Sequence, residues 1–330
     1  MIRIKLGSKG ASVSGDGFTI TLDHASGDMS SLRFVSHAHS DHISDIRSGQ
    51  RVVCSDPTEI FCAIRGKFFD KVSFGRASLV PSGHILGSTA FYVPGEFLYT
   101  GDFNDRDRPF LNGFRPPQAK VVVTEATYGV RKFTFSEEKE TISEAVERIK
   151  ELLGRGKCVI VVGYPLGKSQ HLQLFFDRHL EGFQCFAWPS IETYNDIYRL
   201  FGKRIRKKEE ITAETTSRLL EAGAGVVYMP SYAKRLPLYE ELRRRGAVSF
   251  AFSGWSILDH YSHMVEADHS YAISDHADFD GLVKCVETAN PEKVYVTHGF
   301  TSELAKALRE KGMDAEPLSD ARSRISRFLD

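Results

Sequence analysis

The fold of this chain is decided by one stretch, Phe34-Val35-Ser36-His37-Ala38-His39-Ser40-Asp41-His42. Three imidazoles and one carboxylate fall within six positions, directly after a short apolar run that is typical of a strand. Imidazole and carboxylate suit zinc, and also iron or manganese. A polar loop with many histidines is the alternative, but clustered histidines repel one another once protonated and have little use in packing. The stretch therefore predicts a metal site.

The spacing of these residues indicates more than one metal ion. In an extended segment alternate side chains face the same way, so His37, His39 and Asp41 can converge on one side. His42 follows Asp41 directly and would face a second point. The sequence therefore predicts two metal ions close together.

The composition is that of an ordinary globular protein. Charged residues make up 26% and hydrophobic residues 42% of the 330 positions. No apolar run has the length of a membrane span, and the first residues lack the apolar core of a signal peptide. These features predict a cytoplasmic protein. The five scattered cysteines form no Cys-x-x-Cys pair, which argues against a disulfide framework or a thiolate zinc site.

Two clusters of basic residues, at 203–208 and 234–245, suggest a local contact with nucleic acid. The formal net charge of zero argues against binding through overall basicity. Acidic residues stand beside both clusters, so an ordinary solvated surface is the alternative.

Two short strands further along the chain each lead into a glycine turn with a ligand-type residue. His84 follows Gly83, and Asp102 follows Gly101. Glycine lets the backbone bend tightly around an ion. Alone, such a histidine is more often an ordinary hydrogen-bonded residue and such an aspartate a turn former. The shared context makes both candidate ligands.

Three later strands also end in functional side chains. The apolar run 120–124 leads to Glu125, at the carboxyl end of a strand, where open α/β sheets place functional groups. Two further strands end at His276 and His298. If these late strands rejoin the early sheet, both histidines return to the metal-binding stretch from far along the chain.

Between them, the segment 130–271 alternates strand and helix patterns, which predicts a largely parallel sheet. The predicted domains are therefore 1–129 and 272–330 as two parts of one domain, with 130–271 inserted.

The insertion contains a glycine turn, 163–169, between a strand and a helix, which resembles a phosphate-binding loop. The turn has one residue fewer between its glycines than the nucleotide P-loop requires. We therefore predict that Lys168 and Ser169 contact a nucleic-acid phosphate and not ATP. An ordinary strand-to-helix turn is the alternative.

Together these motifs resemble the metallo-β-lactamase fold with a β-CASP insertion, a family of zinc-dependent nucleases acting on RNA or DNA. The stretch from His37 to His42 alone marks only the superfamily, which includes other hydrolases. The motifs that narrow the resemblance are Gly83-His84, Gly101-Asp102, Glu125-Ala126-Thr127-Tyr128-Gly129, Ser274-Asp275-His276-Ala277-Asp278 and Thr297-His298-Gly299. The chain is most similar to the short exonuclease-type members, called ligase-associated DNA exonucleases or predicted RNA 3′-end processing exonucleases.

The resemblance implies an α/β fold, namely a metallo-β-lactamase αββα sandwich with an inserted β-CASP domain of largely parallel sheet. It also implies a set of metal ligands. These are His37, His39 and His84 for the first metal, Asp41, His42 and His298 for the second, and Asp102 bridging both. Two adjacent metals can lower the pKa of a shared water to about 7 and stabilise attack on phosphorus.

The resemblance further implies that His276 protonates the leaving oxygen and that Glu125 holds its imidazole in place. Asp41, His276 and Glu125 are thus the predicted catalytic residues. A purely structural hydrogen bond between Glu125 and His276 is the alternative.

The predicted function is a dimetal-dependent nuclease that hydrolyses phosphodiester bonds of single-stranded RNA or DNA, as an exonuclease in RNA processing or DNA repair. Two zinc ions are the expected cofactors, with manganese or iron as alternatives. The expected partners are the nucleic acid, a second copy of the chain and nucleic-acid-processing proteins, with no membrane.

Two other function classes stay open. The first is a small-molecule hydrolase of esters, thioesters or lactones, against which the large insertion and His276 argue. The second is a non-catalytic nucleic-acid-processing subunit, against which the complete set of seven ligand-type residues argues.

Overall fold

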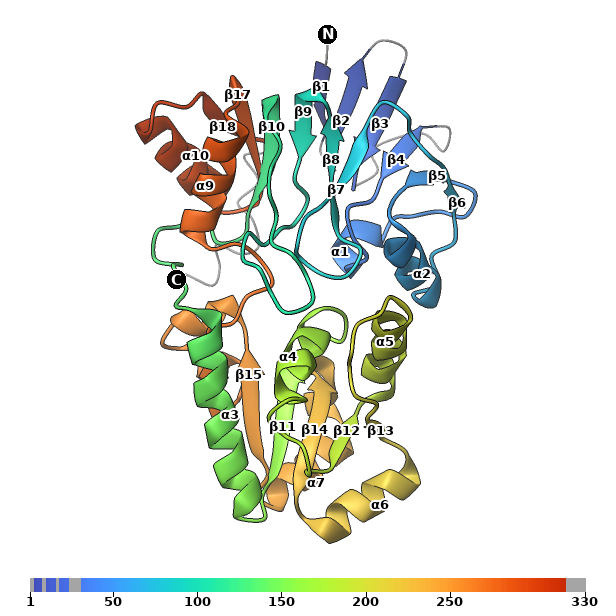
Figure 1. The fold of residues 1–330 in the computed structure, drawn as a ribbon, viewed down its shortest axis with the longest axis vertical. Coiled ribbons are helices and arrows are strands. Elements are labelled where there is room, and N and C mark those ends of the chain that lie inside the picture. Colours follow the sequence, from blue (N-terminus) through green and yellow to red (C-terminus); the bar gives the residue numbers. More distant parts are fainter. Residues whose placement is uncertain (1–2, 8–9, 16–17, 24–30, 319–330) are drawn as a thin grey trace. The chain divides into compact units, whose positions relative to one another are not determined.

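The computed structural model describes residues 3–7, 10–15, 18–23 and 31–318. The chain divides into two compact units, of which the first consists of 1–134 with 276–330 and the second of 135–275. The second unit therefore interrupts the first in the sequence. Figure 1 shows the first unit in blue, cyan and red, and the second in green to orange.

The N-terminal sheet of the first unit is six-stranded and mixed in the described part of the chain. Its strands, in spatial order, are β1 (Arg3–Gly7), β2 (Gly10–Gly15), β3 (Phe18–Leu22), β4 (Leu32–Phe34), β5 (Arg51–Val53) and β6 (Asp70–Lys71). The first three strands pair antiparallel and the rest parallel. Helices α1 (Ser40–Ile43) and α2 (Asp56–Ile64) follow β4 and β5, so the predicted metal-binding stretch begins where β4 ends.

The other sheet of the first unit joins early and late parts of the chain. Its strands, in spatial order, are β18 (Ala315–Pro317), β17 (Lys293–Gly299), β10 (Ala119–Ala126), β9 (Gly95–Tyr99), β8 (Thr89–Val93) and β7 (Ser78–Pro81). β17 pairs parallel with β10, which places Thr297 opposite Glu125. The late strand β17 thus rejoins the early sheet, as the sequence predicts. The same expectation for the strand before His276 is wrong, because its residues 269–271 pair within the sheet of the second unit, and His276 follows it in a loop.

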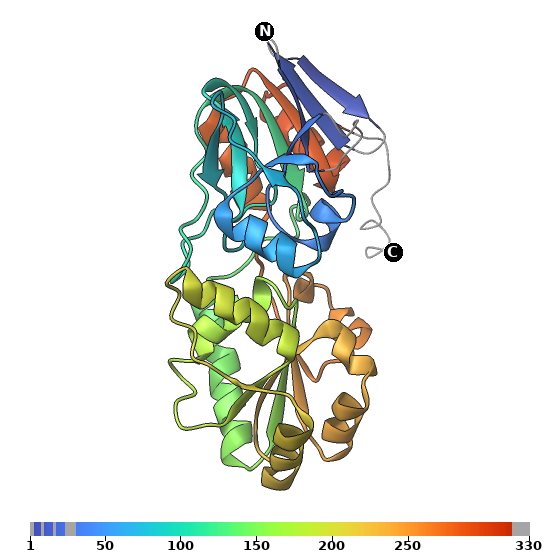
Figure 2. The same ribbon diagram turned by 90° about the vertical axis from the view of Figure 1, so that its right-hand side faces the viewer.

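The two sheets of the first unit pack face to face around one apolar core, which contains Val13, Ile20, Leu22 and Phe34 from one sheet and Phe91, Phe97, Tyr99 and Val123 from the other. On the opposite face of the second sheet lie α9 (Phe279–Ala289) and α10 (Thr301–Glu310), drawn in orange to red (Figures 1 and 2). Their leucines belong to one buried cluster with Val122 and Val296 of the sheet. This layering confirms the predicted sandwich of sheets and helices.

The second unit is built on a six-stranded parallel sheet of described residues. Its strands, in spatial order, are β13 (Glu209–Glu210), β12 (Cys185–Ala187), β14 (Gly225–Pro230), β11 (Cys158–Gly163), β15 (Val248–Phe252) and β16 (His269–Tyr271). Its helices are α3 (Glu138–Gly154), α4 (Lys168–Phe176), α5 (Pro189–Leu200), α6 (Ala213–Ala222), α7 (Pro237–Arg244) and α8 (Tyr261–Met264), with short 3₁₀ helices η1 (Ser231–Arg235) and η2 (Gly254–Ile257). Helices α3, α4 and α5 cover one face of the sheet, and α6 and α7 cover the other. The parallel sheet predicted from the alternating pattern is confirmed.

All five cysteines are free and buried, in agreement with the absence of a predicted disulfide framework. Burial raises the pKa of Cys62 to about 12, which keeps this thiol protonated near neutral pH. Within the described ranges, every helix is too short or too polar to cross a membrane.

Candidate active site

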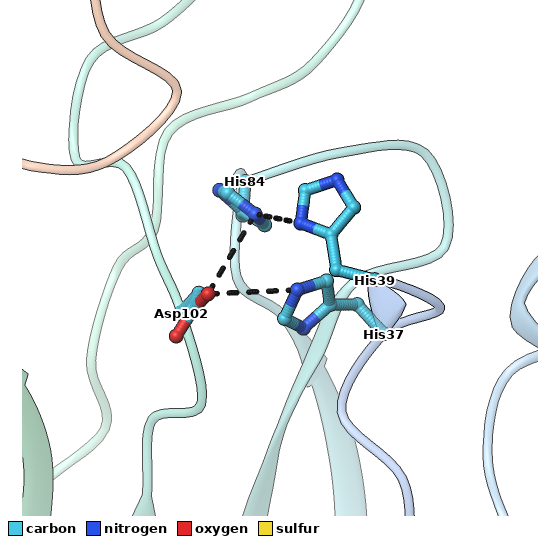
Figure 3. A group of neighbouring side chains, drawn as sticks. All are labelled: His37, His39, His84 and Asp102. Carbon is cyan, nitrogen blue, oxygen red and sulfur yellow. Dashed lines mark hydrogen bonds and ion pairs between the residues drawn. The ribbon is translucent and has the colours of Figure 1, made fainter. Parts of the chain in front are cut away.

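Four ligand-type side chains converge in the first unit, namely His37, His39, His84 and Asp102 (Figure 3). One ligand atom from each lies within 4.8 Å of the others. Nε2 of His84 is 3.1 Å from Nδ1 of His39 and 3.8 Å from Oδ2 of Asp102. Nε2 of His37 is 3.5 Å from the same oxygen of Asp102. Three separate segments of the chain therefore supply one compact group of donors.

This donor set fits a transition-metal ion. Nε2 of His37 is buried and has no hydrogen-bond partner among the described residues. A buried polar atom without a partner is destabilising, and coordination to a cation would satisfy it. Three imidazoles and one carboxylate favour zinc, iron or manganese over the oxygen-preferring magnesium and calcium.

A second set of residues lies beside this group. Nε2 of His42 is 3.4 Å from Oδ2 of Asp102 and 3.7 Å from Oδ2 of Asp41. The ring centroids of His42 and His298 are 5.6 Å apart. The side chain of Asp41 is 74% exposed, whereas His42 is buried. Asp102 therefore contacts both sets of residues.

The local backbone explains how the ring of His42 comes close to that of His37. The extended segment after β4 ends at His39, and α1 begins at Ser40. This turn brings the ring centroid of His42 within 4.1 Å of that of His37. The convergence of Asp41 with His37 and His39, expected for a fully extended segment, is therefore wrong, because the chain turns before Asp41.

The turn that carries His84 depends on Gly83. Gly83 has a φ of +74°, and a Cβ atom there would lie 2.5 Å from the carbonyl oxygen of Asn104. Replacing Gly83 with alanine is therefore expected to lower the free energy of unfolding by roughly 1–3 kcal/mol or more, through both backbone strain and the clash. Gly66 is the matched control, because its φ is +71° and nothing lies within 4 Å of the added atom. Urea unfolding of both variants measures the difference, and equal losses would contradict the clash.

A buried carboxylate that sequence analysis missed, Asp23, supports His42. Oδ2 of Asp23 lies 2.9 Å from Nδ1 of His42 and accepts hydrogen bonds from Tyr99 (2.6 Å) and the Ser36 hydroxyl (2.7 Å). Burial acts to raise the pKa of Asp23, but the charge of His42 and hydrogen bonds from His42, the backbone N–H of Ser36 and Tyr99 outweigh it and lower the pKa to about 2. The resulting carboxylate keeps a proton on Nδ1 of His42, which leaves Nε2 to coordinate a metal.

Replacing Asp23 with asparagine is expected to weaken metal binding about 10- to 100-fold, because the imidazole of His42 loses its charged partner. Asparagine suits the position, since Asp23 has a φ of +51° and asparagine tolerates this region. Competition with a chromophoric chelator measures the affinity. Tyr99→Phe removes one hydrogen bond to Asp23 and should have a smaller effect. An unchanged affinity in Asp23→Asn would show that this carboxylate does not support the site.

Glu125 and His276 form a further group with Asp102, again within 4.8 Å of one another. Nδ1 of His276 is 3.0 and 3.1 Å from the two oxygens of Glu125. Glu125 is 1% exposed and also accepts hydrogen bonds from the backbone of Phe103 and Thr127. Because a carboxylate only accepts, Nδ1 of His276 carries a proton. The side chain of His276 is 21% exposed, so its Nε2 is the nitrogen that can exchange a proton.

The residues predicted to contact phosphate are buried in the second unit. Nζ of Lys168 donates a hydrogen bond of 2.7 Å to the carbonyl of Ile273 and lies 3.2 Å from Oδ2 of Asp275. The hydroxyl of Ser169 donates to the carbonyl of Tyr164. Both side chains thus take part in internal hydrogen bonds, and their contact with phosphate stays a prediction.

Ion pairs neutralise much of the basic clusters. Arg243 pairs with Asp268, and Arg244 pairs with Glu241. Lys208 is buried against Asp177. For these residues the structure favours an ordinary paired surface over a phosphate track.

Comparison with known proteins yields a domain match and two kinds of relative. Residues 262–316, which include His276 and His298, match the family model "Zn-dependent metallo-hydrolase RNA specificity domain". The "Probable DNA ligase" of Opitutus terrae is 28% identical over 303 residues, which cover 86% of this chain and 28% of that protein. "Endoribonuclease ysh1" of Aspergillus fumigatus is 30% identical over 112 residues, which cover 32% of this chain and 13% of that protein. The chain thus matches well under half the length of these relatives.

Proposed function

We propose that the chain is a metal-dependent nuclease of the β-CASP family with a metallo-β-lactamase fold, which its sandwich of sheets and its match to the metallo-hydrolase domain model support, and that it hydrolyses phosphodiester bonds at the ends of single-stranded nucleic acid. One observation carries the proposal. Asp102 lies within one group with three histidines and within another with Glu125 and His276. A candidate metal site and a candidate proton donor thus share one residue, which supports metal-assisted hydrolysis of a phosphodiester.

The proposed cofactors are two zinc ions, with manganese or iron as alternatives. Their proposed ligands are His37, His39 and His84 for one ion, Asp41, His42 and His298 for the other, and Asp102 for both. Bound ions would supply a coordinated water of pKa about 7 and polarise a phosphoryl oxygen.

His276 is the proposed proton donor. Breaking the bond between phosphorus and the leaving oxygen leaves negative charge on that oxygen, and Nε2 of His276 would deliver the proton that neutralises it. Glu125 orients the ring through Nδ1 and stabilises its charged form. Glu125 and His276, together with Asp41 through its proposed place among the metal ligands, are the proposed catalytic residues.

DNA is the first candidate substrate and RNA the second. The relative that aligns with 86% of this chain carries the name of a DNA ligase, which supports a role in DNA repair. The name of the matched domain model and the endoribonuclease relative support RNA. The homodimer, the partner proteins and the cytoplasmic location stay predictions.

Matched 5′-labelled and 3′-labelled single strands of DNA and RNA test the proposal. We expect the zinc- or manganese-loaded protein to shorten one polymer from one end, which also gives the direction of cleavage. If a protein shown to hold metal cleaves neither polymer, the nuclease proposal is wrong. Ester and thioester substrates would then test the small-molecule alternative.

A further inference from the structure

Four aromatic side chains, none of which the proposed function uses, follow the carboxyl ends of the strands in the parallel sheet of the second unit. Each follows the carboxyl end of one of four neighbouring strands. They are Trp188 after β12, Tyr232 after β14, Tyr164 after β11 and Trp255 after β15. They include both tryptophans of the chain. We call these four residues the aromatic edge.

The two tyrosines of the aromatic edge are strongly exposed. Tyr164 is 69% exposed and Tyr232 54%. Their positions are nevertheless held, because the hydroxyl of Tyr232 lies 3.1 Å from that of Ser190. The carbonyl of Tyr164 accepts hydrogen bonds from the backbone and the side chain of Ser169. Exposed aromatic rings on a fixed backbone are typical of binding surfaces.

The two tyrosines also follow two neighbouring strands whose connecting helices lie on opposite faces of the sheet. β11 and β14 are neighbours, with Gly163 opposite Pro230. The helices that follow them, α4 and α7, pack against opposite faces of the sheet. In open α/β sheets, ligands bind outside the carboxyl ends of strands at such a switch point.

The charge around the aromatic edge indicates the kind of ligand. The four segments that follow these strands, at 164–167, 188–191, 231–235 and 253–258, contain no aspartate or glutamate. Of the two acidic residues that directly follow a segment, Glu192 is buried and paired with Arg199, and Asp259 is exposed. The segments contain Lys234, which is half-buried, and Arg235, which is exposed. Aromatic faces together with cations suit a single-stranded nucleic acid, whose bases stack and whose phosphates are anionic.

We propose that the aromatic edge is a stacking site for unpaired bases of the substrate strand, with Tyr164 and Tyr232 as the stacking residues. Lys234 and Arg235 would contact the neighbouring phosphates. The site deepens the proposed function and rests on it for the identity of the ligand. It would hold any base, because every base offers a π face, and would bind single strands in preference to duplexes.

Tryptophan fluorescence tests the site without cleavage. The full chain is titrated, in the presence of a metal chelator, with an oligothymidylate and with an abasic strand of equal length. Because Trp188 and Trp255 are the only tryptophans, quenching reports directly on the aromatic edge. We expect quenching by the oligothymidylate and roughly 25-fold or more weaker binding of the abasic strand, because it loses the stack on both tyrosines.

Substitutions at the tyrosines separate stacking from other effects. Tyr164→Ala and Tyr232→Ala should each weaken binding by roughly 5- to 150-fold, whereas Tyr164→Phe and Tyr232→Phe keep the ring and should bind like the wild type. Equal affinity for normal and abasic strands, or wild-type affinity in the double alanine variant, would overturn the stacking site. The stacking site would also be overturned if the alanine variants bound nucleic acid normally but formed smaller oligomers than the wild type. The aromatic edge would then be a self-association surface.

Cleavage by the wild type distinguishes the two proposals. If the wild type cleaves and the alanine variants bind normally, the stacking site is wrong and the nuclease stands. If binding depends on the tyrosines but no polymer is ever cleaved, the stacking site stands and the proposed function is wrong.

Discussion

Replacing Asp102 with asparagine is expected to slow cleavage of a single strand by roughly a thousandfold or more. Oδ2 of Asp102 lies within 3.8 Å of Nε2 atoms of three histidines, His37, His42 and His84. Burial acts to raise the pKa of Asp102, but the charge of His42 and a hydrogen bond to it hold the pKa well below its usual range. The residue is therefore an ionised carboxylate, and a neutral amide would neither attract nor bridge metal ions as well.

The rate of cleavage and the metal content of the purified protein measure this effect together. Asp107→Asn is the matched control, because Asp107 is an exposed aspartate that pairs with Arg115 in the same loop region. We expect this control to retain metal and activity. An Asp102→Asn protein that cleaves at the wild-type rate would show that this carboxylate is not part of the reaction centre.

Replacing His276 with alanine is expected to slow cleavage by about 10²- to 10⁴-fold while leaving the metal content unchanged. His276 lies next to Asp102 but is held by Glu125, so its loss removes a proton donor and no proposed metal ligand. Glu125→Gln should cause a smaller loss, because the imidazole stays but loses its charged partner.

A substrate with sulfur in place of the leaving oxygen distinguishes proton donation from a structural role. A thiolate leaves without being protonated far more readily than an alkoxide, as the low pKa of thiols implies. Cleavage of this substrate should therefore be nearly as fast in His276→Ala as in the wild type. Equal losses on both substrates would contradict the assigned role of His276.

The fold was largely predictable because its strands have strong local signals. The apolar runs that became β10 and β11 are buried strands, and the alternating helices and strands of 130–271 form a parallel sheet. The strand character of 293–299 was predictable in the same way, but its pairing with β10 was not, and the strand before His276 joined the other unit. Each of the predictable features depends on the period of hydrophobic residues, which is visible in a single sequence.

The site was predictable only where its residues form motifs. Asp23 lies 19 positions before His42 and carries no motif, so only the tertiary structure reveals their contact. The turn at Ser40 changes which side chains face one another, and periodicity does not detect a four-residue helix. The burial of Lys168 depends on Ile273 and Asp275, about a hundred positions away.

Zinc titration of the metal-depleted protein tests the central claim most directly. Cleavage of a labelled single strand is followed while the bound zinc is counted in the same samples. We expect no cleavage without metal, and an activity that rises with bound zinc and saturates when two ions per chain are held. Undiminished cleavage by protein without bound metal, or a fully loaded protein that cleaves neither DNA nor RNA, would contradict the account.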